Sequence, residues 1–259
     1  MSRPADMIWR IIGALYVVFL LTPLLLVVLF SFTNRGIAAF PIEHISLQWW
    51  RAMIDDPEFF PALKNSLTIG GTVGLISAVV GTMAAMGLAR IEPSRAQTLT
   101  AILCLPLMLP PLLLAVSLLS FYTRAVGIPL TLATVIMSHL LFTLPFVVLV
   151  VYARLRNFDY RVVESARDLG ASPLHAFLTV TLPIIRPTVV GAALIAVSLS
   201  VDDFIITNFT IGGGVTLPTF VWGMIRTSLT PAANAVGTLI LVLTVGTTLI
   251  ALRLTRYRG

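Results

Sequence analysis

Charged residues are scarce in this chain of 259 residues: only 11% are Asp, Glu, Lys or Arg, while 58% are hydrophobic. A soluble domain carries about 25% charged residues. The shortage of charge therefore excludes an ordinary soluble domain and indicates a membrane protein. The net charge of +6 would suit a nucleic-acid partner, but in so apolar a chain the basic residues are better explained by orientation in the bilayer. No nucleic acid is expected to bind.

Residues that bind metals or phosphates are also few. Cys104 is the single cysteine, so the chain forms no internal disulfide, and the three histidines, His44, His139 and His175, lack the spacing of a zinc site. The single lysine, Lys64, follows Phe-Pro-Ala-Leu, whereas a phosphate-binding loop needs glycines before its lysine. The sequence predicts no metal site, no catalytic residue and no cofactor bound by this chain. If ATP drives the protein, another chain binds it.

Long apolar stretches are what the sequence does contain. A membrane-spanning helix needs roughly 20 apolar residues, and six stretches meet that requirement. They lie at about 8–32, 66–89, 99–121, 128–153, 188–211 and 233–252. The expected fold is therefore an all-α integral membrane protein with six transmembrane helices. The first stretch is longer than the apolar core of a signal peptide and lacks a small-residue cleavage site, which favours an uncleaved anchor.

The basic residues predict the orientation of these spans. With the N-terminus inside the cell, twelve of the 17 lysines and arginines lie on the cytoplasmic side. Both termini are therefore expected in the cytoplasm, as is the polar segment 154–187. On the outer side, 33–64 is the longest loop, and 212–232 is expected to contain a short helix along the membrane face.

Small residues and prolines predict how the spans pack. Small residues recur at helical spacing in the second stretch, where they let helix backbones approach closely. Packing within the chain and contact with a second membrane subunit both explain them. The two neighbouring stripes are Gly70, Gly74 and Ala78, and Ser77, Gly81 and Ala85. Prolines in the third and fourth stretches predict kinked helices. These prolines are Pro106, Pro110, Pro111 and Pro145.

The polar segment 154–187 has the signals of two short helices. Asp159 suits the N-cap of the first, which is predicted over about 160–169, and Gly170 stands where a left-handed residue ends a helix. Ser172-Pro173 is a strong start for the second helix, with Ser as N-cap and Pro at the first helical position. Leu182-Pro183 is expected to end that helix before the next span.

Both short helices carry an apolar face. A helix of about nine residues is marginal alone in water, so it must pack on something. A groove of a soluble partner and the protein's own span ends are equally good covers for these faces. The faces are Leu174, Phe177, Leu178 and Thr181 on the second helix and Val162, Ala166 and Leu169 on the first.

The same segment resembles the cytoplasmic signature of permease subunits of bacterial ATP-binding cassette (ABC) importers. That signature is Glu-Ala-Ala, three residues, Gly, nine residues, Ile, one residue, Leu-Pro. Here Glu164-Ser165-Ala166, Gly170, Val180 and Leu182-Pro183 match it in register, and Ser165 and Val180 are mild departures. The resemblance implies that this loop docks into a cleft of the ATP-binding subunit and couples it to the spans. The coupling residues it implies are Glu164, Ser165, Ala166, Gly170, Leu174 and Phe177.

Two adjacent acids, Asp202 and Asp203, lie inside the fifth apolar stretch. A charge at membrane depth costs about 2.5–3.5 kcal/mol on insertion scales, which makes both acids functional candidates. No Lys or Arg lies at a comparable depth in any span, so an internal ion pair is not expected. Two carboxylates with aromatic neighbours suit a cationic substrate; a structural role as a helix cap, or a pair with an arginine of a partner, is the alternative. The predicted substrate pathway comprises Asp202, Asp203, Phe204, Asn208 and Phe209.

The stretch Leu199–Thr207 is similar to spermidine/putrescine importer permeases of the PotC type, and so is Ser228–Ala235, which matches their Ser-Pro-x-x-Asn-Ala segment. The resemblance implies a type I ABC importer permease with the MetI-like fold, forming one domain over 1–259 in the bacterial cytoplasmic membrane. The coupling loop would be 154–187.

That resemblance also implies partners and a mechanism. The partners would be a second homologous permease, two ATP-binding subunits that use ATP and Mg²⁺, an extracytoplasmic solute-binding protein and membrane lipid. This chain would move a polyamine by alternating access and perform no enzymatic step. Other solutes, such as aminoethylphosphonate or ferric iron, are the alternative within this class. An ion-driven secondary carrier and a membrane anchor without transport are alternatives from other classes.

Overall fold

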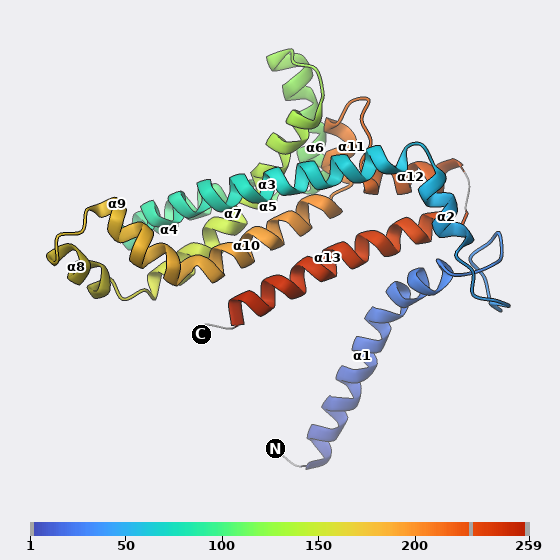
Figure 1. Ribbon diagram of the computed structural model, residues 1–259, viewed down its shortest axis with the longest axis horizontal. Helices are drawn as coiled ribbons and strands as arrows, with labels where there is room; N and C mark the ends of the chain where they lie inside the picture. Colours follow the sequence, from blue (N-terminus) through green and yellow to red (C-terminus); the bar gives the residue numbers. More distant parts are fainter. Residues whose placement is uncertain (1–2, 228–229, 257–259) are drawn as a thin grey trace. The chain divides into compact units, whose positions relative to one another are not determined.

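The computed structural model describes residues 3–227 and 230–256, and most of them are helical (Figure 1). Within these residues the one strand-like pairing is an isolated antiparallel bridge between Thr33 and Ile45. The predicted all-α fold is therefore confirmed. Five of the described helical segments are long and apolar enough to cross a membrane. These are Met7–Phe30, Phe59–Leu88, Leu132–Arg156, Pro173–Asp202 and Ala232–Leu254.

The chain divides into two compact units. One comprises the residues up to Phe60 together with Phe220–Leu241, and the other comprises Pro61–Thr219 together with the residues from Val242 onward. Each unit is built mainly of helices.

In the first unit, α1 (Arg3–Phe30) is the longest element. Its spanning part, Met7–Phe30, is strongly apolar, with Arg10 as its one charged residue, and none of it is buried inside the protein. A helix of this kind needs apolar surroundings, which a bilayer supplies. The loop that follows contains α2 (Gln48–Asp55), a helix that the sequence did not predict, anchored by the buried side chain of Met53.

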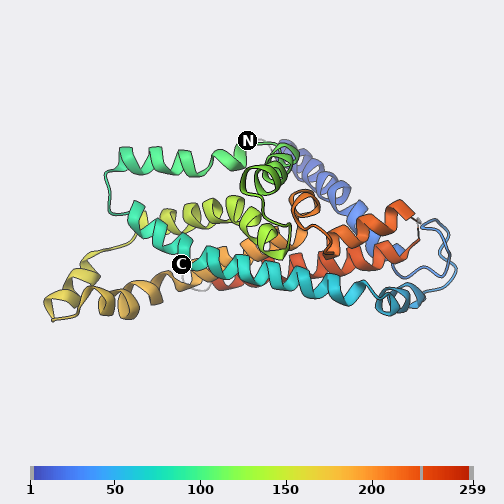
Figure 2. The same ribbon diagram turned by 90° about the horizontal axis from the view of Figure 1, so that it is seen from above.

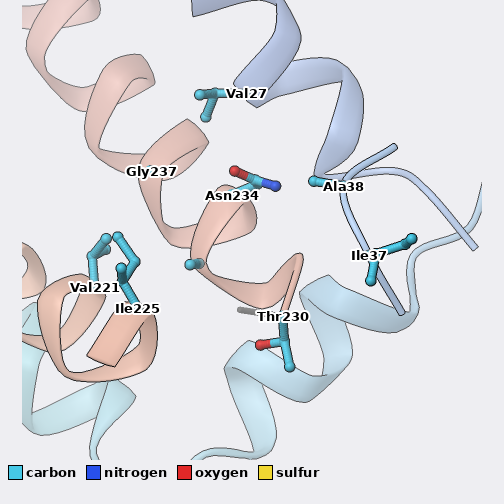
Figure 3. Close-up of a pocket in the computed structure, with 9 residues that line it drawn as sticks. Val27, Ile37, Ala38, Val221, Ile225, Thr230, Asn234 and Gly237 are labelled. Carbon is cyan, nitrogen blue, oxygen red and sulfur yellow. The ribbon is translucent and has the colours of Figure 1, made fainter. Parts of the chain in front are cut away.

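The first unit also contains a largely apolar pocket of about 580 Å³ (Figure 3). It lies between the end of α1, the loop after it, α12 (Leu217–Thr227) and the start of α13 (Ala232–Arg256). Figure 3 shows the Asn234 amide extending from α13 toward Ala38. Helix α12 confirms the short helix expected within 212–232. Ser228 and Leu229, which open the PotC-like segment around Asn234, lie outside the described residues.

In the second unit, α3 (Phe59–Leu88), α7 (Leu132–Arg156) and α10 (Leu182–Asp202) run side by side (Figures 1 and 2). The small residues of α3 allow this packing. A Cβ atom at Gly70 would lie 2.6 Å from the Val201 side chain, and one at Gly81 would lie 2.9 Å from the Val147 side chain.

Two hydroxyl groups also connect α3 with α7. The Ser77 hydroxyl of α3 is 3.0 Å from the Thr143 hydroxyl of α7, and both residues are buried. The small-residue stripes of α3 thus serve packing within this chain.

The third predicted span is broken in the structure. Instead of one helix over 99–121 there are α4 (Pro93–Leu103), α5 (Leu105–Met108), α6 (Pro111–Ser120) and the π-helix η1 (Phe121–Val126). Leu109 is extended, with ψ 139°, because a residue that precedes a proline avoids the helical region. The predicted kink is confirmed at this point, while the six-span count stays a prediction. By contrast, α7 runs unbroken through Pro145.

Candidate functional site

The polar segment 154–187 begins with a side-chain cap. Helix α8 (Arg161–Asp168) has Tyr160 at its N-cap position, one residue later than predicted. Asp159 nevertheless does the work of a cap, because its Oδ1 accepts the backbone N–H of Arg161 at 3.1 Å. The Arg161 guanidinium also donates to Asp159 at 3.0 Å, and these bonds lower the pKa of the Asp159 carboxyl.

Gly170 ends α8 in a Schellman motif. Its φ is +95°, in the left-handed region that favours glycine. The Gly170 N–H donates to the Arg167 carbonyl at 2.9 Å, and the Ala171 N–H donates to the Ala166 carbonyl at 3.1 Å, which are the two bonds of that motif. The predicted left-handed position is therefore confirmed. A Cβ atom at Gly170 would meet nothing within 4 Å, so the requirement for glycine is conformational and not steric.

The second short helix starts as predicted but does not stop as predicted. Ser172 caps α9 (Pro173–Ala176) by accepting the His175 N–H at 3.3 Å. The chain then continues through the π-helix η2 (Phe177–Thr181) directly into α10. The prediction that Leu182-Pro183 ends the helix was wrong. Pro183, which has no backbone N–H, falls in the first turn of α10. The wider π turn of η2 just before it accommodates this proline without ending the helix.

The apolar faces of this loop are only partly covered. Ala176 and Thr181 are buried, and α8 packs against α9 and η2. Leu169 is 89% exposed and Leu174 is 66% exposed, while Phe177 is half-buried. The loop projects at one end of its unit (Figure 1). The fold therefore covers part of each face and leaves leucines open to solvent or to a partner.

Among the predicted coupling residues, Glu164 and Ser165 are exposed and Ala166 is half-buried. Ser165 bonds back to its own helix, since its hydroxyl donates to the Arg161 carbonyl at 2.9 Å. Glu164 lines a groove of about 480 Å³ between this loop and the ends of α3 and α7. Tyr160 lines the same groove, and its burial raises the pKa of its hydroxyl.

The helix that carries the two acids is interrupted. Helix α10 ends at Asp202, Asp203 is extended with φ −70° and ψ 119°, and a short helix α11 (Ile205–Thr210) follows. The prediction of one helix over 188–211 was wrong.

Asp203 caps the second half of this interrupted helix. Its Oδ2 accepts the backbone N–H of Thr207 at 2.9 Å and lies 3.2 Å from the Thr207 hydroxyl. A carboxylate at a helix N-terminus satisfies a free backbone donor and suits the helix dipole. The break at Asp203 is thus stabilised by the side chain of Asp203 itself.

His139 of α7 joins this cap, which the sequence reasoning missed. Its Nε2 is 3.3 Å from Asp203 Oδ2 and 3.0 Å from the Thr207 hydroxyl, while its Nδ1 is 2.7 Å from the Ser200 hydroxyl. His139 is fully buried. The sequence reasoning considered only lysine and arginine as basic neighbours of the acids, so it did not consider this histidine. A histidine inside the apolar stretch 128–153 was the signal available in the sequence.

The other residues of the predicted pathway divide into two groups. Asp202 and Asn208, which flank the break, are exposed, whereas Phe204 and Phe209 are half-buried. Phe209 packs against the cluster that contains Ile206. Among residues 3–227 and 230–256, no group of three or more His, Cys, Asp or Glu side chains could hold a metal ion. Asp202 therefore presents an exposed carboxylate at the break.

The chain has spans that run side by side, an interrupted helix that carries two acids, and a structured loop between two spans. Together these features define a membrane-spanning transport component. Residues 71–257 match the family described as "Binding-protein-dependent transport system inner membrane component", and the chain belongs to that family. It is the permease subunit of an ABC importer, located in the bacterial inner membrane. It is not an enzyme; ATP hydrolysis belongs to a separate subunit.

Known relatives cover nearly the whole chain. The putrescine transport system permease protein PotI of Escherichia coli K12 is 34% identical over 241 residues, which are 90% of this chain and 85% of PotI. The spermidine/putrescine transport system permease protein PotC of Haemophilus influenzae is 29% identical over 92% of each chain. A chain from the solved structure of a bacterial alginate ABC transporter, in complex with an alginate pentasaccharide-bound periplasmic protein, matches with a TM-score of 0.72. It is 17% identical, covers 98% of this chain and 95% of its own, and shows a common fold.

Proposed function

We propose that this chain is the permease for a polyamine of the putrescine and spermidine type. The observation that carries the proposal is the exposed Asp202 carboxylate at the break between α10 and α11. A carboxylate at membrane depth is costly unless it serves a polar path, and an ammonium group is its natural counterpart. Relatives named for putrescine and spermidine transport support the same substrate class over aminoethylphosphonate or ferric iron.

The proposed pathway runs past this break. Asp202 binds a substrate ammonium group, and Asn208 offers an amide as a further hydrogen-bonding group. Phe204 and Phe209 lie next to these residues in sequence and supply aromatic rings for cation–π contact. Asp203 belongs to the pathway as the residue that shapes the break, since its Oδ2 already accepts hydrogen bonds from the backbone N–H and the hydroxyl of Thr207.

The proposed assembly contains four kinds of subunit. A second homologous permease, two ATP-binding subunits and an extracytoplasmic solute-binding protein complete the importer. In this proposal residues 1–259 form one transmembrane domain with six spans and both termini in the cytoplasm. The loop 154–187 docks into the ATP-binding subunit through Glu164, Ser165, Ala166, Gly170, Leu174 and Phe177. The exposed leucines of this loop support the docking role, because a partner can cover them.

Uptake by the complete importer tests the substrate class. The four genes are expressed together in cells that lack polyamine uptake, and entry of labelled spermidine is measured. Putrescine in excess should compete with the label, whereas sulfate and aminoethylphosphonate should not. Competition by an anionic solute without competition by putrescine would overturn the proposed substrate. The variant Asp202→Asn should reduce uptake while the complex still assembles, as judged by co-purification of the subunits.

A further inference from the structure

We infer that His139 is a positioning residue, which holds the interrupted helix in the form that presents Asp202 to the transport path. The inference deepens the proposed function and rests on it for the identity of the substrate. His139 comes from α7, whereas the residues it binds lie on both sides of the break between α10 and α11. One buried side chain therefore joins three helices at the point where the helix is interrupted.

The contacts of His139 form a clamp across the break. Nδ1 is 2.7 Å from the hydroxyl of Ser200, in the last turn of α10, and Nε2 is 3.0 Å from the hydroxyl of Thr207, in α11. His139, Ser200 and Thr207 are all buried. A buried polar group that loses its partner is strongly destabilised, so each of these contacts resists movement of one half of the helix against the other.

The hydrogen bonds fit a neutral imidazole with its proton on Nε2. Asp203 Oδ2 already accepts the backbone N–H of Thr207 at 2.9 Å and lies 3.2 Å from the Thr207 hydroxyl, which donates to it. The Thr207 oxygen is then free to accept from Nε2–H of His139, while Nδ1 accepts the hydroxyl proton of Ser200. Every polar atom of the clamp has a partner in this arrangement. A side chain with one acceptor and one donor at the same spacing should replace the imidazole.

The clamp matters for Asp202 because Asp203 is the next residue. With Asp203 extended and fixed by Thr207 and His139, the chain leaves the helical path directly after Asp202, and the Asp202 side chain stays exposed at the end of α10. Without His139, the Asp203 carboxylate loses one of its buried neighbours and the break can re-form as continuous helix, which would change the surroundings of the Asp202 side chain. The two acids thus have different tasks: Asp203 maintains the break and Asp202 faces the substrate.

The test compares His139→Leu with His139→Gln in the complete importer. Leu removes both contacts, whereas Gln retains one acceptor and one donor about as far apart as the ring nitrogens. We expect His139→Leu to raise the KM for spermidine about tenfold, the factor that corresponds to roughly one net hydrogen bond. His139→Gln should stay within about twofold of the parent protein. His44→Gln, at an exposed loop position, is the matched control and should change nothing.

A second measurement does not depend on the substrate. Cys104 is the single cysteine, so Asp202→Cys in a Cys104→Ser background provides one thiol whose rate of reaction with a cationic thiosulfonate reports how accessible position 202 is to a cation. His139→Leu should change that rate about tenfold, and His139→Gln should not. An unchanged rate with Leu, or an equal change with Gln and Leu, would overturn the positioning role. If the importer carries no polyamine but the thiol rates behave as expected, the substrate proposal fails and the clamp stands. If His139→Leu does not assemble, two other variants are measured in the same way: Ser200→Ala, which removes one contact of His139, and Thr207→Val, which removes the other together with the hydroxyl contact to Asp203.

Discussion

Gly170→Ala should weaken binding of the ATP-binding subunit to this permease. Gly170 has φ +95°, and an L-residue in the left-handed region costs roughly 1–2 kcal/mol. Because a Cβ atom there meets nothing within 4 Å, this backbone cost is the whole effect. Few packing contacts stabilise the loop, since α8 contains no buried residue. The strain therefore shifts the loop away from its docking form.

The expected loss of affinity follows from that cost. A shift of about 1.4 kcal/mol lowers the fraction of docking-competent loop about tenfold, and the apparent Kd rises by the same factor. The assay titrates purified ATP-binding subunit against the permease in detergent or nanodiscs. Gly170→Asn should fall between Gly170→Ala and the parent protein, because asparagine tolerates the left-handed region better than alanine does.

Gly87→Ala is the matched control for this experiment. Gly87 lies in α3, and a Cβ atom there also meets nothing within 4 Å, but its backbone is helical. Alanine at this position should leave the affinity unchanged and slightly favour the helix. Equal affinities for Gly170→Ala, Gly87→Ala and the parent protein would refute the docking form described for the loop.

Two further predictions concern the spans. Asp202→Asn should lower uptake and leave the melting temperature of the complex unchanged. Asp203→Ala should lower the melting temperature, because a helix cap contributes about 1–2 kcal/mol. Equal melting temperatures for the two variants would contradict the proposal that the two acids have different roles. Gly74→Ala should destabilise the protein by about 1–3 kcal/mol through overlap of its Cβ with the Val197 side chain. Gly71→Ala, which meets nothing within 4 Å, is its control in a thermal unfolding assay, and a similar loss from both variants would count against close packing at Gly74.

The polar segment 154–187 was the most predictable part of the molecule. Its signals are local: a glycine that must be left-handed, and a serine followed by a proline at a helix start. Both were confirmed at Gly170 and Ser172. The helix end expected at Pro183 does not occur, because the π-helix η2 before it accommodates a residue that has no backbone N–H. The formation of a π turn depends on the winding of several residues and not on the identity of one residue.

The sequence by itself determined the membrane location, the all-α class, the family signature and the presence of acids at membrane depth, because each of these follows from composition or from spacing along the chain. Only the tertiary structure showed the surroundings of the acids. Asp203 lies beside His139, a residue more than 60 positions away in sequence that contacts both halves of the broken helix. Contacts of that kind come from the packing of α7 against α10, and no periodicity within either helix reports them.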